Sequence, residues 1–478
     1  MTRSIVRLSG VLAVLLIALL ANITYLQVFK ADEYRTASGN SRAILEEYSR
    51  ERGPILIGRE AIANSVETGG QLKYLREYSQ GQLYAPATGF YSQVYGSTGV
   101  EKAENPVLSG TDDRLLFDRL QQLLAGRDPQ GGGVTLTLNA AAQKAAYAGL
   151  GGRRGAVAAI DPQTGEILAL VQSPSFDPNR LSSHNSKQIQ QYYKELTADP
   201  DEPLLNRPLA ASSPPGSTFK IVVAAAALES GDFTPSTVIP GPASYTLPGT
   251  STQMKNASRT ACSPNNKLTL TEAFVVSCNT AFAWLANQLG DDAIRAQAEK
   301  FGFGTSFNVP MPAAAGRYPD NPDPAQTALT GIGQFDVRAT ALNIAQVSAA
   351  VGAGGTVRDP NLVSEISSPD LTVLDDIAPS TFGQAMDQTR AKELTEMMVQ
   401  VVDRGSGGNG AIPGVRVAGK TGTAENGNGQ PDTVWFTSFT PADDPEVAVA
   451  VVLEEAGGSG NTLAAPIARS VMEAVLGR

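Results

Sequence analysis

The chain has 478 residues, 42% of them hydrophobic, so it can bury a large core and fold as two or three domains. With 37 basic against 47 acidic residues the net charge is −10, which argues against nucleic acid and against binding to an anionic membrane surface by charge. The one histidine, His184, lies in a polar run typical of a solvated loop. A zinc enzyme would lack its usual ligands, and a serine enzyme would need lysine as its base.

The N-terminus contains the one apolar stretch long enough to span a bilayer, from Leu8 to Phe29, about 33 Å as a helix. Arg3 and Arg7 precede this stretch, which places the N-terminus in the cytoplasm and the rest of the chain outside. A cleaved signal peptide is the alternative, although no small-x-small cleavage site follows. Under both interpretations the residues that follow this stretch are exported. We divide the chain into an anchor (1–30), an accessory region (31–133) and a catalytic region (134–478).

The accessory region mixes charged helical pieces with turn-rich stretches and carries no catalytic constellation. Residues 112–125 are expected to form a helix. Tyrosines and valines recur often enough to fill a small core, and an irregular spacer without a core is the alternative. This region is expected to hold the catalytic region away from the membrane.

The catalytic region has predicted strands near both of its ends. Residues 134–138 alternate as a strand and 140–150 read as a helix. Hairpins are predicted at 156–171 and at 435–452, and a last helix follows Pro466. Helices are predicted between the hairpins at 217–230, 270–289, 291–301 and 339–350. The pattern predicts an α+β domain with one antiparallel sheet formed by early and late strands, and a mostly helical insert.

A helix starting at Ser217 carries the first candidate site. Pro214, Pro215 and Gly216 prevent the helix from extending upstream, and the residues that follow are apolar on every side up to Gly231. Ser217 and Lys220 lie three positions apart and therefore share one face. A buried lysine with a depressed pKa could accept the serine proton, but Ser-x-x-Lys alone arises about once by chance in a chain of ordinary composition.

Two further motifs follow in order. Ser277-Cys278-Asn279 can turn the serine and the asparagine to one side and the cysteine to the other. Lys420-Thr421-Gly422-Thr423 lies on a predicted strand, where Gly422 would leave room for a substrate backbone and Lys420 with the threonine hydroxyls could hold a carboxylate.

Ser-x-x-Lys, Ser-x-Asn and Lys-Thr-Gly in this order are typical of penicillin-recognising serine acyltransferases. The whole chain resembles the class B penicillin-binding proteins, in particular the actinobacterial penicillin-binding protein A type. Further stretches carry the resemblance, namely 52–55, 88–91, 99–101, 108–110, 206–207, 331–334 and 418–425. There are two departures: Cys278 stands inside the second motif, and Asp432-Thr433-Val434 precedes Trp435 where relatives often have a histidine and a small residue.

The resemblance implies a peptidoglycan D,D-transpeptidase whose substrate is a stem peptide ending in D-Ala-D-Ala. Ser217 would be the nucleophile and Lys220 its base; Ser277 would relay a proton while Asn279 orients side chain and substrate. The backbone N–H groups of Ser217 and Thr423 would form the oxyanion hole. Lys420, Thr421 and Thr423 would bind the terminal carboxylate, a group that β-lactams also present. No metal, nucleotide or organic cofactor is implied.

Several alternatives remain open from the residues. Cys262 and Cys278, 16 positions apart, form a disulfide or remain two buried thiols. A secreted β-lactamase, a β-lactam receptor, a D,D-carboxypeptidase and a non-catalytic scaffold share parts of the pattern. The single anchor and long accessory region disfavour the first two. A wall-synthesis complex that includes a glycan polymerase is the expected protein partner, and the plasma membrane, with the catalytic region outside the cytoplasm, is the expected location.

Overall fold

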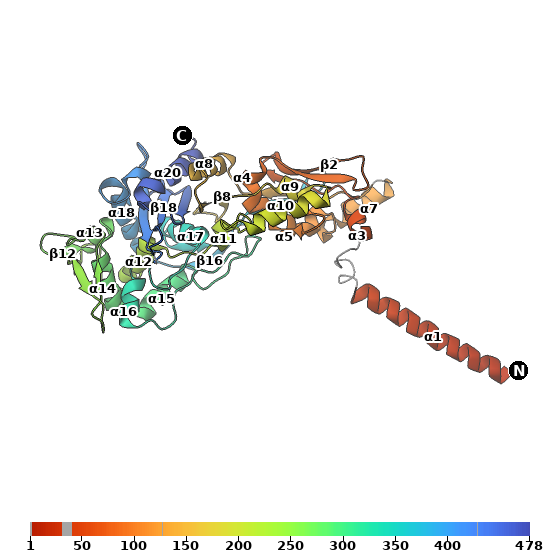
Figure 1. Ribbon diagram of the computed structural model, residues 1–478, viewed down its shortest axis with the longest axis horizontal. Helices are drawn as coiled ribbons and strands as arrows, with labels where there is room; N and C mark the ends of the chain where they lie inside the picture. Colours follow the sequence, from red (N-terminus) through yellow and green to blue (C-terminus); the bar gives the residue numbers. More distant parts are fainter. Residues whose placement is uncertain (1, 31–40, 127, 428) are drawn as a thin grey trace.

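The computed structural model describes residues 2–30, 41–126, 128–427 and 429–478; the start of the accessory region at 31–40 lies outside the described residues. Helix α1 (Thr2–Val28) extends away from the body that the rest of the described chain forms (Figure 1). Its stretch Ile5–Val28 is apolar and long enough to cross a membrane, and none of it is buried against other residues. The observed helix agrees with the predicted anchor.

The catalytic region is built on a five-stranded antiparallel sheet of order β17-β18-β19-β7-β8. Its strands are β7 (Gly155–Ile160), β8 (Ile167–Ser173), β17 (Ala418–Ala424), β18 (Thr433–Thr440) and β19 (Val447–Leu453). Strand β19 joins the late hairpin to the early one, so the predicted sheet of early and late strands is confirmed. Strand β17 lies at the edge, where one side of its backbone remains open to a ligand.

Helices cover both faces of this sheet. On one face α8 (Ala140–Leu150) and α20 (Ala465–Val475) pack together through residues such as Ala146, Leu150 and Val471. On the other face the mostly apolar helix α17 (Ala341–Gly352), whose residues 341–351 are all buried, packs against β19. The resulting three layers separate two hydrophobic cores, one on each side of the sheet.

The insert between the two hairpins is mostly helical, as predicted. Its main helices are α12 (Lys220–Ser230), α13 (Leu270–Val275), α14 (Asn279–Leu289), α15 (Asp291–Lys300), α16 (Pro324–Thr330) and α18 (Gln388–Arg404). Short strand pairs accompany them: β9 (Val238–Pro240) with β12 (Lys267–Thr269), β10 (Ser244–Thr246) with β11 (Gln253–Lys255), and β13 (Thr356–Arg358) with β16 (Thr381–Gln384). The single helix expected over 270–289 is wrong, because the chain breaks at 276–278 between α13 and α14.

The accessory region has its own sheet, and its buried side chains are continuous with the core of the catalytic region, so it is not an irregular spacer. The sheet has the order β15-β14-β6-β1-β2-β3. Its strands are β1 (Ile55–Ile57), β2 (Glu60–Glu67), β3 (Tyr74–Tyr78), β6 (Gly133–Leu136), β14 (Val363–Ser367) and β15 (Val373–Asp376). Two of these strands come from residues far along the chain, which ties the accessory region to the catalytic region. Helices α4 (Gly81–Thr88), α5 (Gly99–Ala103) and α6 (Asn105–Leu108) add to its core.

A buried charged cluster stabilises this region. Glu101 on α5 is fully buried and accepts hydrogen bonds from Arg52 Nε at 2.5 Å and Arg76 Nε at 2.6 Å. The hydroxyl of Tyr78 lies 3.1 Å from the same carboxylate. Although burial raises the pKa of Glu101, the two guanidinium groups outweigh it and leave that pKa below its usual value. One carboxylate therefore holds two buried cations in their charged form.

Candidate active site

The predicted nucleophile lies in a tight turn at the start of a buried helix. Ser217 is part of the 3-10 helix η2 (Gly216–Phe219), which continues directly into α12. Every residue from 220 to 228 is buried, as the apolar sequence predicted, whereas Ser217 keeps part of its surface open. Gly216 has φ 54°, and a Cβ there would meet the Thr423 carbonyl oxygen at 2.4 Å. The close approach that only glycine permits places Thr423 beside the serine.

The Ser277 motif forms the break between α13 and α14. Ser277 has φ 56°, a left-handed conformation that is unusual for a residue with a side chain. The break turns Ser277 and Asn279 toward Lys220 and buries Cys278 on the other side. This is the arrangement that the residue spacing predicted for the three positions.

The two lysines meet at Ser277. Lys220 Nζ donates to the Ser277 carbonyl oxygen and to Asn279 Oδ1, both at 2.8 Å, and lies 3.3 Å from Ser277 Oγ. Lys420 Nζ donates to the same hydroxyl at 2.9 Å and to the Thr421 carbonyl oxygen at 3.1 Å. Both lysines are fully buried. Ser277 Oγ is thus within hydrogen-bond distance of both amines.

The electrostatics of this cluster favour neutral amines. Burial, and secondarily the charge of Lys420, holds the pKa of Lys220 well below its usual value. Burial alone lowers the pKa of Lys420 to about 7. Within the described ranges, neither amine forms an ion pair with a carboxylate. A neutral amine in this setting has a lone pair that can accept a proton.

Strand β17 brings the third motif to the serine turn. Thr423 is exposed at the open edge, and Thr421 Oγ1 lies 2.9 Å from Ser406 Oγ. The space expected beside Gly422 for a substrate backbone is occupied by the protein: a Cβ there would meet Pro215 O at 2.8 Å and Thr218 Cγ2 at 2.9 Å. Gly422 therefore lets the serine turn approach the strand.

Cys262 and Cys278 form a disulfide, with a Cα–Cα distance of 6.0 Å. The bond attaches the 256–266 loop to the Ser277 break. The alternative of two buried thiols does not hold in this structure.

The penicillin-binding protein transpeptidase domain matches residues 155–473, and the penicillin-binding protein A dimerisation domain matches residues 52–134. The chain belongs to the penicillin-binding protein family. The first match contains all three motifs, and the second covers most of the accessory region and ends one residue beyond it.

Relatives and solved structures agree with this membership. The chain is 41% identical to the peptidoglycan D,D-transpeptidases PbpA of Mycolicibacterium smegmatis and Mycobacterium tuberculosis, over 100% of its own length and 99% of theirs. It superposes on the ceftriaxone acyl-enzyme complex of penicillin-binding protein A from M. tuberculosis with a TM-score of 0.88 at 41% identity, covering 90% of this chain and 100% of that one. The penicillin G acyl-enzyme of the same protein gives 0.86, covering 89% and 100%.

Sequence reasoning missed several side chains around the site of this penicillin-binding protein. The ring centroids of Phe282 and Phe274 lie 5.4 Å from Lys220 Nζ and 5.6 Å from Lys420 Nζ, respectively, and both rings are fully buried. Trp435 Nε1 donates to the Pro214 carbonyl oxygen at 3.0 Å and so fixes the approach to Ser217. Phe274 and Phe282 flank the Ser277 motif in the sequence and could have predicted apolar side chains around the two lysines. Nothing in the sequence indicated the contact between Trp435 and Pro214.

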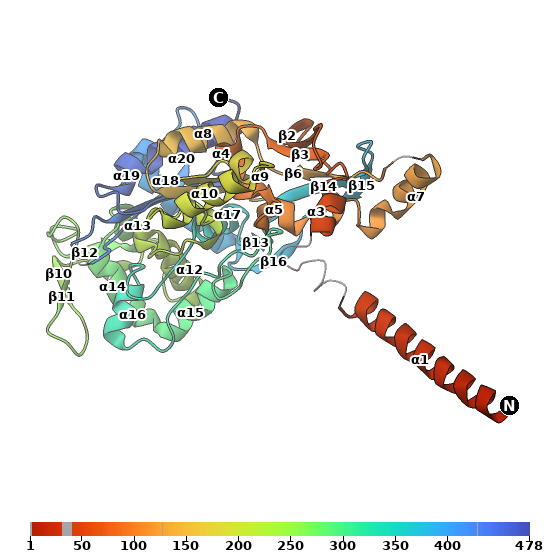
Figure 2. The ribbon, with the colours of Figure 1, turned by 45° about the vertical axis from the view of Figure 1, so that its right-hand side comes forward.

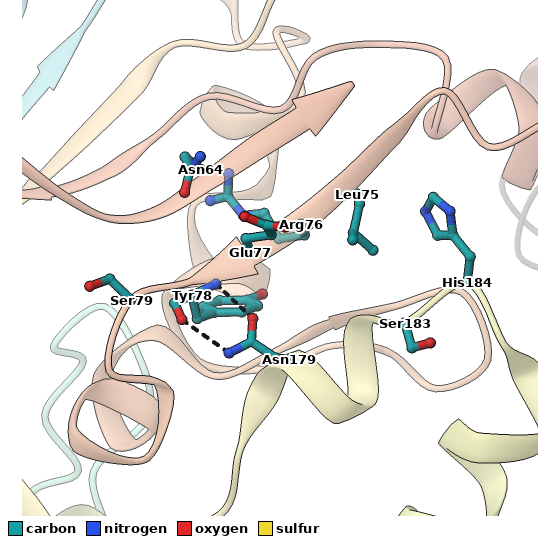
Figure 3. A pocket seen from close by; sticks show the side chains of 9 residues that line it. All are labelled: Asn64, Leu75, Arg76, Glu77, Tyr78, Ser79, Asn179, Ser183 and His184. Atoms are coloured by element: carbon teal, nitrogen blue, oxygen red, sulfur yellow. Dashed lines mark hydrogen bonds between the residues drawn. The ribbon is translucent and has the colours of Figure 1, made fainter. Parts of the chain in front are cut away.

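The histidine lies apart from this cluster, beside strand β3. A cavity of about 590 Å³ there is lined by Asn64, Leu75, Arg76, Glu77, Tyr78, Ser79, Asn179, Ser183 and His184. Figure 3 shows Asn179 bonded to the backbone of Tyr78, with distances of 2.9 and 3.0 Å, and His184 on the other side of the cavity. His184 Nε2 lies 3.1 Å from the Tyr74 carbonyl oxygen. None of the predicted catalytic residues lines this cavity, and the histidine packs against the accessory sheet.

Proposed function

We propose that this chain is a peptidoglycan D,D-transpeptidase in which Ser217 is the nucleophile and Lys220 its base. The observation that carries the proposal is the convergence of Lys220, Ser277, Asn279 and Lys420 through hydrogen bonds of 2.8–3.3 Å without a carboxylate among them. The identity to the PbpA transpeptidases over the full chain supports the same activity and covalent inhibition by β-lactams.

In the acylation step, Ser217 Oγ attacks the carbonyl carbon of the penultimate D-Ala while its proton passes to Lys220. The two carbonyl-type acceptors of Lys220 Nζ match the two N–H groups of a neutral amine, which leaves the lone pair for the serine proton. The oxyanion forms near the backbone N–H groups of Ser217 and Thr423, which the contact at Gly216 keeps together.

The remaining steps use the hydroxyl of Ser277, which lies within hydrogen-bond distance of both lysine amines. As the C–N bond of the tetrahedral intermediate breaks, Ser277 passes a proton to the leaving D-Ala amine and Lys220 replaces it. Asn279 orients the Lys220 side chain. The hydroxyls of Thr421 and Thr423 hold the terminal carboxylate together with Lys420, because an anion bound beside this amine raises its pKa from about 7 and favours its protonated form. The amine of a second stem peptide then attacks the ester carbon and gives a proton to Lys220. The C–O bond to Ser217 breaks as the crosslink forms, and Lys220 returns the proton to Ser217 Oγ.

The location and partners follow from this reaction. Arg7 precedes the membrane-spanning stretch, which supports a single-pass plasma-membrane protein with residues 41–478 on the extracytoplasmic side. Crosslinking joins strands that another enzyme must polymerise. A glycan polymerase in the same wall-synthesis complex is therefore the partner that the reaction requires.

Intact-protein mass spectrometry after incubation with benzylpenicillin tests the nucleophile. The parent and the exposed control Ser212→Ala should gain one drug mass, located at Ser217 by peptide mapping, and Ser217→Ala should gain none. An adduct on Ser217→Ala would contradict the assignment. Hydrolysed drug without an adduct would indicate a β-lactamase, and intact drug without an adduct a scaffold.

A further inference from the structure

The helix α7 (Leu116–Leu124) of the accessory region presents its apolar face outward. Its apolar residues fall within an arc of about 120° on a helical wheel. They are Leu116, Phe117, Leu120, Leu123 and Leu124, with exposed fractions of 48, 76, 50, 56 and 90%. No residue of α7 is buried. This apolar face, defined by the five residues, has no counterpart within the part of the chain that the structure describes.

The polar side of the same helix faces the protein. Asp118, Arg119 and Gln122 are half-buried. Arg119 Nη1 donates to the Gly110 carbonyl oxygen at 3.2 Å, and the Gln130 N–H donates to Gln122 Oε1 at 2.9 Å. A helix on the surface of a water-soluble body normally has the opposite orientation, so α7 is oriented for an apolar phase outside the molecule.

The position of α7 indicates what that phase is. Helices α3 (Ser41–Glu47) and α7 lie at the same end of the body, away from α13 and α14, in both Figure 1 and Figure 2. The segment that follows α3 contacts the segment that follows α7. Gln130 Nε2 donates to Glu51 Oε2 at 2.6 Å, and the Gly131 N–H donates to the Glu51 carbonyl oxygen at 2.9 Å. Ten residues lie between Lys30 and Ser41, so the Cα atoms of these two residues are at most about 40 Å apart. The anchor therefore keeps α7 close to the bilayer.

The size of the face disfavours a second copy as its main partner. A dimer through α7 alone would bury on the order of 600 Å² per chain, less than the roughly 800 Å² typical of a stable interface. A tethered helix needs no such area, because the anchor already supplies a high effective concentration at the membrane.

From these observations we propose that α7 lies in the lipid–water interface with its apolar face inserted among the acyl chains. The helix is then a second membrane contact that fixes the accessory region relative to the bilayer, in addition to the α1 anchor. The ion pair of Arg114 Nη1 with Asp375 Oδ2, at 2.7 Å, connects the residues just before α7 to β15 and so to the shared sheet. Through that sheet, the membrane contact constrains the height and tilt of the catalytic region.

Tryptophan quenching in nanodiscs tests the orientation of α7. The full chain is reconstituted into phosphatidylcholine–phosphatidylglycerol nanodiscs with either ordinary or brominated acyl chains, and the emission of the parent is subtracted. The emission added by Phe117→Trp should fall at least about two-fold in brominated discs. The emission added by Asp118→Trp should not, because this half-buried position lies about 160° around the helix from the centre of the apolar face. Leu124→Trp, at the most exposed position of the helix, should repeat the result of Phe117→Trp.

Acylation by benzylpenicillin verifies that each variant is folded, since none of these residues belongs to the catalytic site. Quenching at neither Phe117→Trp nor Leu124→Trp would overturn the proposal. Equal quenching at positions 117 and 118 would overturn the assigned orientation. An unquenched but blue-shifted Phe117→Trp in discs that hold two chains would assign the face to a second copy instead.

Discussion

The accessory region and the catalytic site each bury two cationic side chains, with opposite results. In the accessory region Arg52 and Arg76 share the carboxylate of Glu101, and although burial opposes the charge of Arg52, Glu101 raises its pKa above the usual value. In the catalytic site Lys220 and Lys420 share only the hydroxyl of Ser277, and burial lowers the pKa of both. A buried cation with a carboxylate remains charged and contributes to the fold, whereas a buried amine without one becomes a base.

The residue types match these two roles. A guanidinium group does not lose its proton in a protein and binds a carboxylate with several N–H groups, so Arg52 and Arg76 suit a permanent cluster. A lysine amine changes its pKa readily on burial, so Lys220 and Lys420 suit proton transfer. Substitutions at both sites test this difference.

The largest effect is expected at the base. Lys220→Met should lower the second-order rate of acylation by benzylpenicillin by about three orders of magnitude or more, because the Ser217 proton loses its acceptor. The rate is measured with a fluorescent penicillin, and Lys300→Met, at an exposed position, should leave it unchanged. A rate within ten-fold of the parent would mean that another group removes the proton.

The next effect is expected in the accessory cluster. Glu101→Gln should lower the free energy of unfolding by about 3–5 kcal/mol, because two buried guanidinium groups lose their carboxylate. Urea denaturation measures the change, with Glu60→Gln on the exposed part of β2 expected within about 0.5 kcal/mol of the parent. A loss below about 1 kcal/mol would show that the guanidinium groups do not depend on the carboxylate.

The smallest effect concerns the pH dependence of stability. The pKa of Lys420 is about 7 in the folded chain and about 10.4 in an unfolded one, so between these values the unfolded state binds more protons. The destabilisation caused by burying this amine is complete below pH 7 and fades as the pH rises toward 10. The free energy of unfolding of the parent should therefore increase relative to that of Lys420→Met, by about 1 kcal/mol per pH unit above pH 7.

Urea denaturation of both proteins at pH 7.0 and 8.0 measures this difference, since the other titrating groups are common to the pair. The same difference at both pH values would contradict a depressed pKa for Lys420. A difference that changes in the opposite direction would indicate an anionic partner for the amine.

Local patterns predicted much of the fold. The apolar run after Ser217 predicted a buried helix, and the hairpins at both ends of the catalytic region predicted its antiparallel sheet. The helix over 270–289 was wrong because apolar periodicity continues through the Ser277 break, where the left-handed backbone of Ser277 depends on tertiary contacts. Strands β14 and β15 could not be assigned to the accessory sheet, because pairing over more than 200 residues leaves no local trace.

The residue types and their order already identified the reactive groups of this penicillin-binding protein: the Ser217, Ser277 and Lys420 motifs, a single histidine outside them, and an apolar N-terminal stretch long enough to span a membrane. How these groups interact depends on the folded structure. It placed Ser277 Oγ between two amines, filled the space beside Gly422 with the serine turn, and joined Cys262 to Cys278. The physical reason is that residue types follow from the chain, whereas the burial that shifts a pKa and the distances that permit proton transfer arise from packing between distant segments.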